Sequence, residues 1–146
     1  RDRSVSRGLG DVYKRQESDR TLVAFGIMGG IFGEGIDLKN DRLIGAIVVG
    51  TGLPQISNER TILKDYYDAE NGCGFDYAFR YPGINKVLQA AGRVIRTTED
   101  TGVILLLDER FWQREYDLLY PREWSDRKPC NIANVGKLVA DFWEQI

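Results

Sequence analysis

Apolar residues of this chain gather in short blocks instead of alternating one by one with polar residues. Three such blocks are bounded by glycine and charged residues, which is typical of strands that are buried on both faces of a sheet. None of them shows the alternation of apolar and polar residues that is typical of a strand with one solvent-exposed face. We therefore predict three strands, at Thr21–Ile27, Leu43–Gly50 and Val103–Asp108.

Helical periodicity fills the intervals between and after these blocks. Asn58–Ala69 predicts a helix whose N-cap is Ser57 or Asn58. Pro82–Arg96 predicts a second helix, because proline is favoured in the first turn. Asn134–Ile146 predicts a third, with its apolar residues on one stripe. Strands that alternate with helices predict an α/β domain with a mostly parallel sheet flanked by helices.

Composition excludes several classes of protein. The 146 residues are 42% hydrophobic, which suits one globular domain and not a disordered chain. No apolar stretch approaches the roughly 20 residues of a membrane span. Histidine is absent, which excludes Ser-His-Asp and Cys-His catalysis and most transition-metal sites. The two cysteines, Cys73 and Cys130, are too few for a disulfide framework or a zinc site. We expect a cytoplasmic protein that holds no metal by itself.

Charge is distributed unevenly along the chain. Residues 1–16 have a net charge of +3, whereas the remainder has −5. A basic segment of this kind is typical of an arm that binds nucleic acid. The string VSRGLGDVYKRQ also looks like a translated artefact that recurs at the ends of assembled metagenomic fragments. We expect residues 1–16 to be a non-native leader, and the chain to be a fragment whose upstream part is missing.

A glycine-rich turn, Gly29–Leu38 (GGIFGEGIDL), follows the first predicted strand. Such a turn lets the backbone approach a phosphate closely. The spacing matches neither GxGxxG nor GxxxxGK[ST], so the dinucleotide fingerprint and the Walker A loop are both absent from it. Glu34 and Asp37 would repel a phosphate but suit a ribose hydroxyl or Mg²⁺. Taken alone, the turn favours a flexible loop with solvated carboxylates.

Two arginines stand near the end of the second predicted helix. Four polar or small residues at i, i+3, i+4 and i+7 are expected on one helical face: Gln89, Gly92, Arg93 and Arg96. The apolar stripe of the same helix comprises Ile84, Val87, Leu88, Ala91 and Ile95. Two guanidiniums about one turn apart are suited to phosphate oxygens. The alternative is a solvated face whose arginines pair with Glu99 or Asp100.

The two motifs together resemble a known family. GGIFGEGIDL, followed some fifty residues later by QAAGRVIR, is similar to motifs V and VI of superfamily 2 helicases, in the form found in the XPD/DinG (Rad3-like) DNA helicases. The resemblance continues through NDRLIGAIVVG, LPQISNER and TGVILLLDERF, and covers about Leu22–Trp124. It implies that residues 17–146 are the C-terminal part of the second RecA-like lobe, a P-loop NTPase-type fold. GxGKT, a DEAH-type box and four iron–sulfur cysteines do not occur in this chain, and belong in this family to the first lobe.

The resemblance also implies roles for particular residues. Arg93 and Arg96 would be arginine fingers on the γ-phosphate of ATP. Gln89 would position them or approach the hydrolytic water, and Gly92 would leave room for the nucleotide. The motif V residues that would bind nucleotide or couple to motif VI are Glu34, Gly35 and Asp37. The candidates for DNA contact are Gly30, Phe32 and Arg80. Asp108-Glu109-Arg110 matches the family's DxR segment, to which we assign a structural role.

The resemblance therefore predicts part of an ATP-dependent DNA helicase that moves 5′ to 3′ on single-stranded DNA. ATP and Mg²⁺ would be shared with the first lobe, and the 4Fe-4S cluster would lie only in the missing part. The partners would be single-stranded DNA and the first lobe of the same full-length chain, which would act as a monomer without membrane contact. The fragment alone would be inactive. The alternative is a non-catalytic RecA-like interaction module; a dehydrogenase is disfavoured by the missing GxGxxG.

Overall fold

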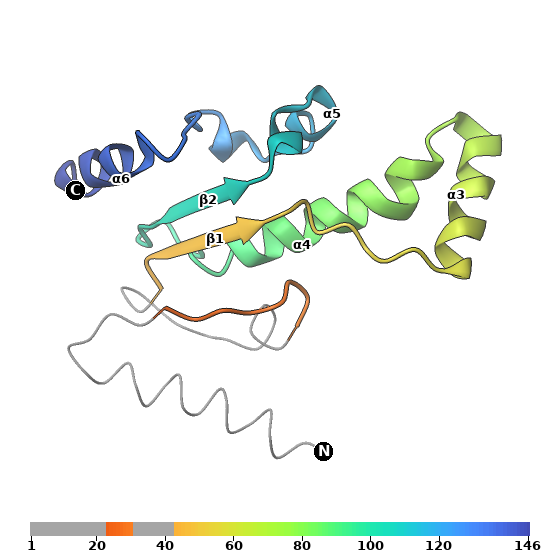
Figure 1. Cartoon of the computed structure of the whole chain (residues 1–146), viewed down its shortest axis with the longest axis horizontal. Helices are drawn as coiled ribbons and strands as arrows, with labels where there is room; N and C mark the ends of the chain where they lie inside the picture. Colours follow the sequence, from red (N-terminus) through yellow and green to blue (C-terminus); the bar gives the residue numbers. More distant parts are fainter. Residues whose placement is uncertain (1–22, 31–42) are drawn as a thin grey trace, which may run out of the picture. The chain divides into compact units, whose positions relative to one another are not determined.

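A computed structural model describes residues 23–30 and 43–146 of the chain (Figure 1). It divides into two compact units, Arg1–Phe111 and Trp112–Ile146, and each is described by itself. In chain order the elements are strand β1 (Gly45–Val49), helix α3 (Asn58–Asn71), the π-helical turn η2 (Asp76–Arg80), helix α4 (Tyr81–Ala91), strand β2 (Val103–Leu107), the 3₁₀ turn η3 (Glu109–Trp112), helix α5 (Arg114–Asp117), the 3₁₀ turn η4 (Arg122–Trp124) and helix α6 (Val135–Glu144).

The two strands form a parallel sheet. Gly45 lies opposite Val103, and Val49 lies opposite Leu107. Parallel neighbours require a crossover connection, and here it contains α3, η2 and α4. The prediction of an α/β fold with a parallel sheet and flanking helices is confirmed, as are the second and third predicted strands and all three predicted helices, apart from their exact ends.

The first predicted strand is wrong for the residues that the structure describes. Residues 23–27 have no strand conformation, and Val23, Phe25 and Ile27 are 73%, 92% and 84% exposed. A strand exists only where its backbone pairs with a neighbour, and an apolar run by itself does not supply that neighbour. The segment instead closes a turn, in which the Gly30 N–H donates to the Ile27 carbonyl at 2.9 Å.

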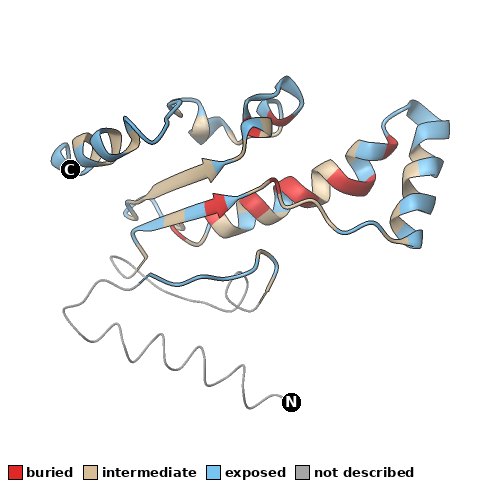
Figure 2. Ribbon diagram, viewed as in Figure 1, coloured by how far each residue is buried: buried red, intermediate tan, exposed pale blue. Residues whose placement is uncertain are grey.

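Burial on both faces is also wrong for β1. Val48 is 4% exposed, whereas Ile47 and Val49 are 64% and 71% exposed. Successive side chains of a strand point to opposite faces, and α4 packs against only one of them (Figures 1 and 2). The apolar run correctly predicted strand conformation but did not reveal how many faces are covered.

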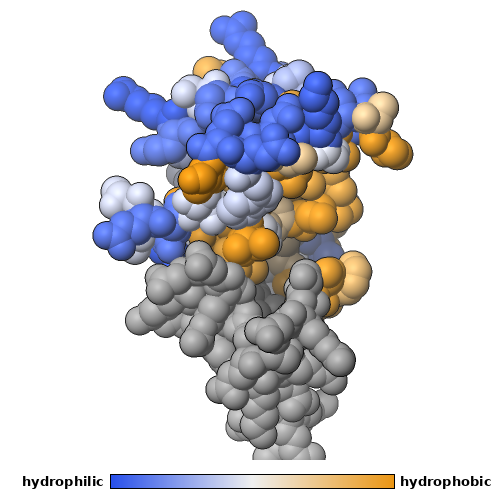
Figure 3. Space-filling view, turned by 90° about the vertical axis from the view of Figure 1, so that its left-hand side faces the viewer, coloured by the Kyte–Doolittle hydropathy of each residue, from blue (hydrophilic) through white to orange (hydrophobic). Residues whose placement is uncertain are grey.

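The buried part of the first unit lies between β1 and α4. Ile84, Val87 and Ala91 of α4 are 3%, 0% and 2% exposed, and they recur at helical spacing. Figure 2 shows buried residues along α4 and in β1, while α3 has none. On the face drawn in Figure 3, apolar atoms reach the surface beside hydrophilic ones. Helix α4 is therefore the element through which this unit is held together.

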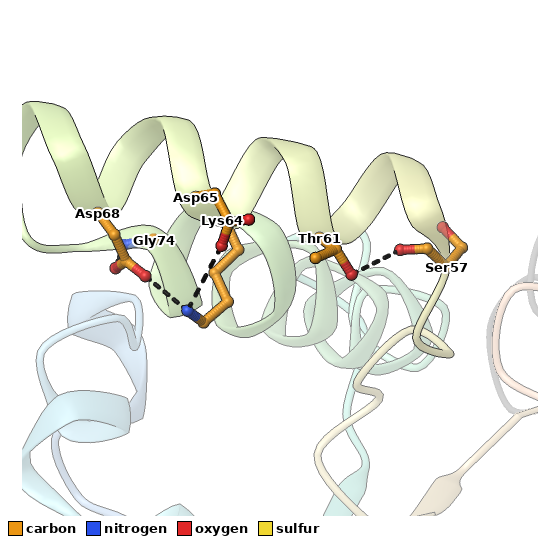
Figure 4. Close-up of polar contacts among 6 residues, drawn as sticks. All are labelled: Ser57, Thr61, Lys64, Asp65, Asp68 and Gly74. Carbon is orange, nitrogen blue, oxygen red and sulfur yellow. Dashed lines mark hydrogen bonds and ion pairs between the residues drawn. The ribbon is translucent and has the colours of Figure 1, made fainter.

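Helix α3 is fixed at both ends by local hydrogen bonds. Ser57 is its N-cap, and its Oγ accepts a hydrogen bond from the Arg60 N–H at 3.3 Å. Near the C-terminal end, Asp68 accepts from Lys64 Nζ at 2.6 Å and from the Gly74 N–H at 2.8 Å (Figure 4). Both donors lower the pKa of Asp68. These bonds define where α3 starts and how the chain turns from α3 into η2.

The backbone of the first turn of α4 packs closely against the backbone of the segment that follows β1, and we call this contact the crossing. A Cβ atom at Gly83 would lie 2.7 Å from the Thr51 carbonyl oxygen, and one at Gly52 would lie 2.7 Å from the Gly83 carbonyl oxygen. Gly83 is buried, and Gly52 has a φ of +68°. Only glycine allows the two backbones to approach this closely.

Arg127 organises the second unit. Its guanidinium forms an ion pair with Asp117, donates to the Trp124 carbonyl at 3.1 Å and lies 4.8 Å from the Tyr120 ring centroid. Burial raises the pKa of Tyr120 to about 12. Helix α6 is amphipathic and has no buried residue. Across both described ranges, none of the helices combines the length and the apolar character that a membrane span requires.

We expect Gly83→Ala to lower the free energy of unfolding, although alanine is the better helix former by ~1 kcal/mol. The new methyl group must displace the backbone of Thr51 or Leu53, and overpacking of this kind costs about 1–3 kcal/mol. Chemical denaturation followed by circular dichroism measures the change. Gly136→Ala in α6 is the matched control, because nothing lies within 4 Å of its added Cβ. If both variants gain stability equally, the crossing does not constrain α4.

Candidate functional site

Helix α4 ends at Ala91, before either predicted arginine finger. Its C-cap is Gly92, and the next N–H groups form tighter bonds that reach back three residues: Arg93 to the Ala90 carbonyl at 3.2 Å, and Val94 to the Ala91 carbonyl at 2.9 Å. The prediction that the helix runs to Arg96 is therefore wrong, and so is the expectation of one helical face for Gln89, Gly92, Arg93 and Arg96. Glycine is a poor helix former, which favours termination at this point.

The tighter turn also changes which side chain faces inward. Val94 is 4% exposed, whereas Ile95 is 45% exposed, although the predicted apolar stripe included Ile95 and not Val94. In a turn with about three residues per revolution, instead of 3.6, residues 91 and 94 lie on the same side, which here is the buried side. Val94 thus extends the buried side of α4 by one more residue beyond the helix.

Asp100 holds the backbone from which the Arg96 side chain starts. Its Oδ2 atom accepts hydrogen bonds from the Arg96 N–H at 2.9 Å and from the Thr97 N–H at 2.8 Å. These two bonds, first of all the one from Arg96, lower the pKa of Asp100. The sequence suggested Asp100 as a partner for an arginine side chain; its hydrogen bonds described here go to the main chain, and the charge of Arg96 also contributes to lowering its pKa.

The structure brings the four residues predicted to form motif VI together at one end of α4. Gln89 and Gly92 are exposed, while Arg93 and Arg96 are half-buried in the turn and the segment that follow. Several predicted site residues lie outside the described part of the chain, as does the predicted leader at residues 1–16. These site residues are Phe32, Glu34, Gly35 and Asp37.

The start of the glycine turn lies beside α4. Gly29 has a φ of +76°, and the position of a Cβ on it would be 3.6 Å from Lys86 Cε. The turn and the helix are more than fifty residues apart in sequence, so neither pattern alone predicted this contact. It places Gly29 and Gly30 next to the helix that carries Gln89.

Arg80, one of the predicted DNA contacts, interacts within the unit. It forms an ion pair with Asp76, and its guanidinium lies 5.4 Å from the Phe75 ring centroid. Its side chain is 18% exposed. Nearby, the rings of Tyr67 and Tyr77 stack with centroids 3.9 Å apart, so part of the aromatic-rich segment serves to pack α3 on η2.

Asp108 and Arg110 form a two-pronged ion pair directly after β2. Arg110 Nε donates to Oδ1 at 2.8 Å and Nη2 donates to Oδ2 at 2.6 Å, and this pairing lowers the pKa of Asp108. Cys73 and Cys130 are free thiols. Within residues 23–30 and 43–146, no three or more His, Cys, Asp or Glu side chains gather as metal ligands would.

The sequence of this chain is similar to those of known proteins. The family model described as "Helicase C-terminal domain" matches residues 5–127. The chain is 30% identical over 144 residues to the ATP-dependent DNA helicase XPD of Sulfolobus acidocaldarius, covering 92% of this chain and 24% of that protein. It is 31% identical over 102 residues to the ATP-dependent DNA helicase DinG of Photobacterium profundum, covering 68% of this chain and 14% of that protein. The chain therefore spans about a quarter or less of these relatives.

The Asp100 hydrogen bonds predict a pH dependence of the turn after α4. Because the pKa of Asp100 is lowered in the folded protein, its stabilising effect is complete above its ordinary value of 3.8 and disappears as pH falls through the lower folded value. In an NMR titration, the amide resonances of Arg96 and Thr97 should shift together with a midpoint below 3.8. Asp100→Asn, the control, should abolish this shift. A midpoint at or above the ordinary value would contradict the assignment.

Proposed function

The chain belongs to the helicase C-terminal domain family, and on this premise we propose that it forms part of the second RecA-like lobe of an ATP-dependent DNA helicase. Its α/β fold with a parallel sheet is RecA-like, and the relatives XPD and DinG are named ATP-dependent DNA helicases. The chain supplies motif VI from the end of α4 and motif V from Gly29–Leu38. The rest of the full-length protein supplies the first lobe, with the P-loop and the 4Fe-4S cluster.

The observation that carries this proposal is the ordered turn after α4. Arg93 and Arg96 follow Gln89 within seven residues, and Asp100 fixes the backbone at Arg96 through two hydrogen bonds. In our proposal both guanidiniums reach the γ-phosphate of an ATP molecule held by the first lobe. There they stabilise the charge that spreads over the phosphoryl oxygens in the transition state. A backbone that is already fixed lowers the cost of bringing a long side chain to that position.

The other site residues have supporting roles. Gln89 positions the arginines or orients the attacking water, and Gly92 keeps side-chain atoms away from the nucleotide. In motif V, Glu34, Gly35 and Asp37 contact the nucleotide or couple it to motif VI. Mg²⁺ is shared between the phosphates and the first lobe, because it prefers phosphate and a few carboxylate oxygens and retains several waters.

The proposed function includes movement on single-stranded DNA from 5′ to 3′. Gly30, Phe32 and Arg80 are the proposed contacts with DNA. Gly29 lies beside Lys86 of α4, which supports a mechanical connection between the glycine turn and motif VI. The net charge of −5 outside residues 1–16 argues against strong DNA binding by this lobe alone. The protein would act as a cytoplasmic monomer.

We expect Arg96→Ala in the full-length protein to reduce kcat for ATP hydrolysis about 10³-fold or more, the magnitude typical of an arginine finger. Nucleotide affinity should change little, because a finger acts mainly in the transition state. Fluorescent-nucleotide binding and steady-state ATPase assays measure the two quantities. Arg122→Ala, which alters an exposed arginine in η4, is the control and should retain full turnover. Unchanged turnover in Arg96→Ala would instead favour a non-catalytic interaction module.

The 146-residue chain alone should show no ATPase activity above background. It contains no GxxxxGK[ST] loop to hold the β- and γ-phosphates, so the fingers have no bound substrate to act on. A phosphate-release assay on the purified chain, with the full-length protein as positive control, tests this expectation. If the chain alone hydrolyses ATP, and if the Arg96→Ala variant of the chain does not, the proposal of two cooperating lobes is wrong.

A further inference from the structure

A proline interrupts the hydrogen-bond ladder just where η2 passes into α4. In a regular α-helix the Ala78 carbonyl would accept from the N–H of residue 82, but Pro82 has none. The preceding turn is π-helical, with the Tyr81 N–H donating to the Asp76 carbonyl five residues back. Ala78 is 0% exposed, so its carbonyl has no access to water. The carbonyl has lost its α-helical donor, and a buried carbonyl that is poorly satisfied is costly.

Arg60 of α3 supplies the donor. Its Nη1–H donates to the Ala78 carbonyl oxygen at 3.0 Å, across 18 residues of sequence. The donor is charged, which makes the hydrogen bond stronger than one between neutral groups. The start of the Arg60 side chain is itself fixed, because its backbone N–H is bonded to the Ser57 cap. The stacked rings of Tyr67 and Tyr77 form a second contact between α3 and η2.

The π-turn decides how α4 is rotated about its axis. If the turn relaxed to regular α-helix, the hydrogen-bond register would shift by one residue, which corresponds to about 100° of rotation. Gly83 already fixes one side of α4 against Thr51. A rotation would therefore have to be absorbed along the helix, towards Gln89 and the arginine-bearing turn.

We propose that Arg60 is a positioning residue of the proposed ATP site: by holding the Ala78 carbonyl, it maintains the π-turn and so sets the direction in which Gln89, Arg93 and Arg96 face. This inference rests on the proposed function. Arg60 itself touches neither nucleotide nor DNA in it. Its effect is on the geometry of the fingers, so it acts on turnover and not on nucleotide affinity.

The test uses the full-length protein, four variants of Arg60 and Pro82, and one control variant. Arg60→Met removes the donor but retains the length of the side chain, and Arg60→Lys restores a charged donor. Pro82→Ala returns a backbone N–H to the Ala78 carbonyl, and the double variant combines it with Arg60→Met. Glu70→Gln is the control on the same helix, because Glu70 is exposed and has no contact with η2 among those described. For each, kcat, KM for ATP and the thermal midpoint are measured at a temperature where the variant is folded.

We expect Arg60→Met to lower both the thermal midpoint and kcat, the latter about 10- to 100-fold, with KM for ATP nearly unchanged. Arg60→Lys should recover most of the lost turnover, and Glu70→Gln should retain the full turnover of the unmodified protein. The double variant is decisive: it should regain thermal stability, because the backbone N–H satisfies Ala78, yet remain slow, because the π-turn is lost. If it regains turnover together with stability, Arg60 is only a structural residue and the proposal is overturned.

Two kinds of failure are distinguishable. If Arg96→Ala hydrolyses ATP as fast as the unmodified protein, the proposed function fails, and the inference about Arg60 fails with it. If Arg96→Ala is inactive but Arg60→Met keeps full kcat, the proposed function stands and only the positioning role is overturned.

Discussion

The packing of α4 on β1 is the constraint on which the rest of the first unit depends. Gly83 and Gly52 let the two backbones cross at a distance that no Cβ atom would allow, and Val87 of α4 is completely buried. The crossing fixes one end of α4, and the buried residues keep the apolar side of the helix away from solvent. Gln89, near the other end of α4, stands on a helix whose first turn is held by these apolar and backbone contacts.

The end of α4 shows how a site can be fixed without a regular element. Gly92 stops the helix, and Asp100 then replaces the missing helical partners with bonds to the Arg96 and Thr97 amides. A helix extended to Arg96 would hold the backbone through its own carbonyls and would need no carboxylate. In the turn, the backbone at Arg96 is held instead by one side chain, that of Asp100, four residues further along the chain. The two arginines therefore start from an irregular segment and not from one face of a straight helix.

Periodicity predicted the elements whose formation depends on their own residues. The strands β1 and β2 and the helices α3 and α6 were predicted to within a few residues, because apolar spacing and the Ser57 cap act locally. A strand at Thr21–Ile27 would need a neighbouring strand to pair with. Burial of Ile47 would need an element that covers its face of β1. Neither requirement can be deduced from an apolar stretch of sequence alone. The spacing predicted which residues would form motif VI, but it did not predict where the helix stops, which involves Gly92 and Asp100.

Pro82 illustrates the same limit more sharply. Proline is favoured in the first turn of a helix, and this local rule correctly predicted that α4 begins near Pro82. In this protein, however, helical residues precede α4 without a break, so the missing N–H removes a donor from a buried carbonyl. The rule identifies the lost hydrogen bond, but only the tertiary structure shows that the replacement comes from Arg60, on a different helix. A polar group that a local rule leaves unsatisfied is therefore a useful place to search for the long-range contacts that orient a site.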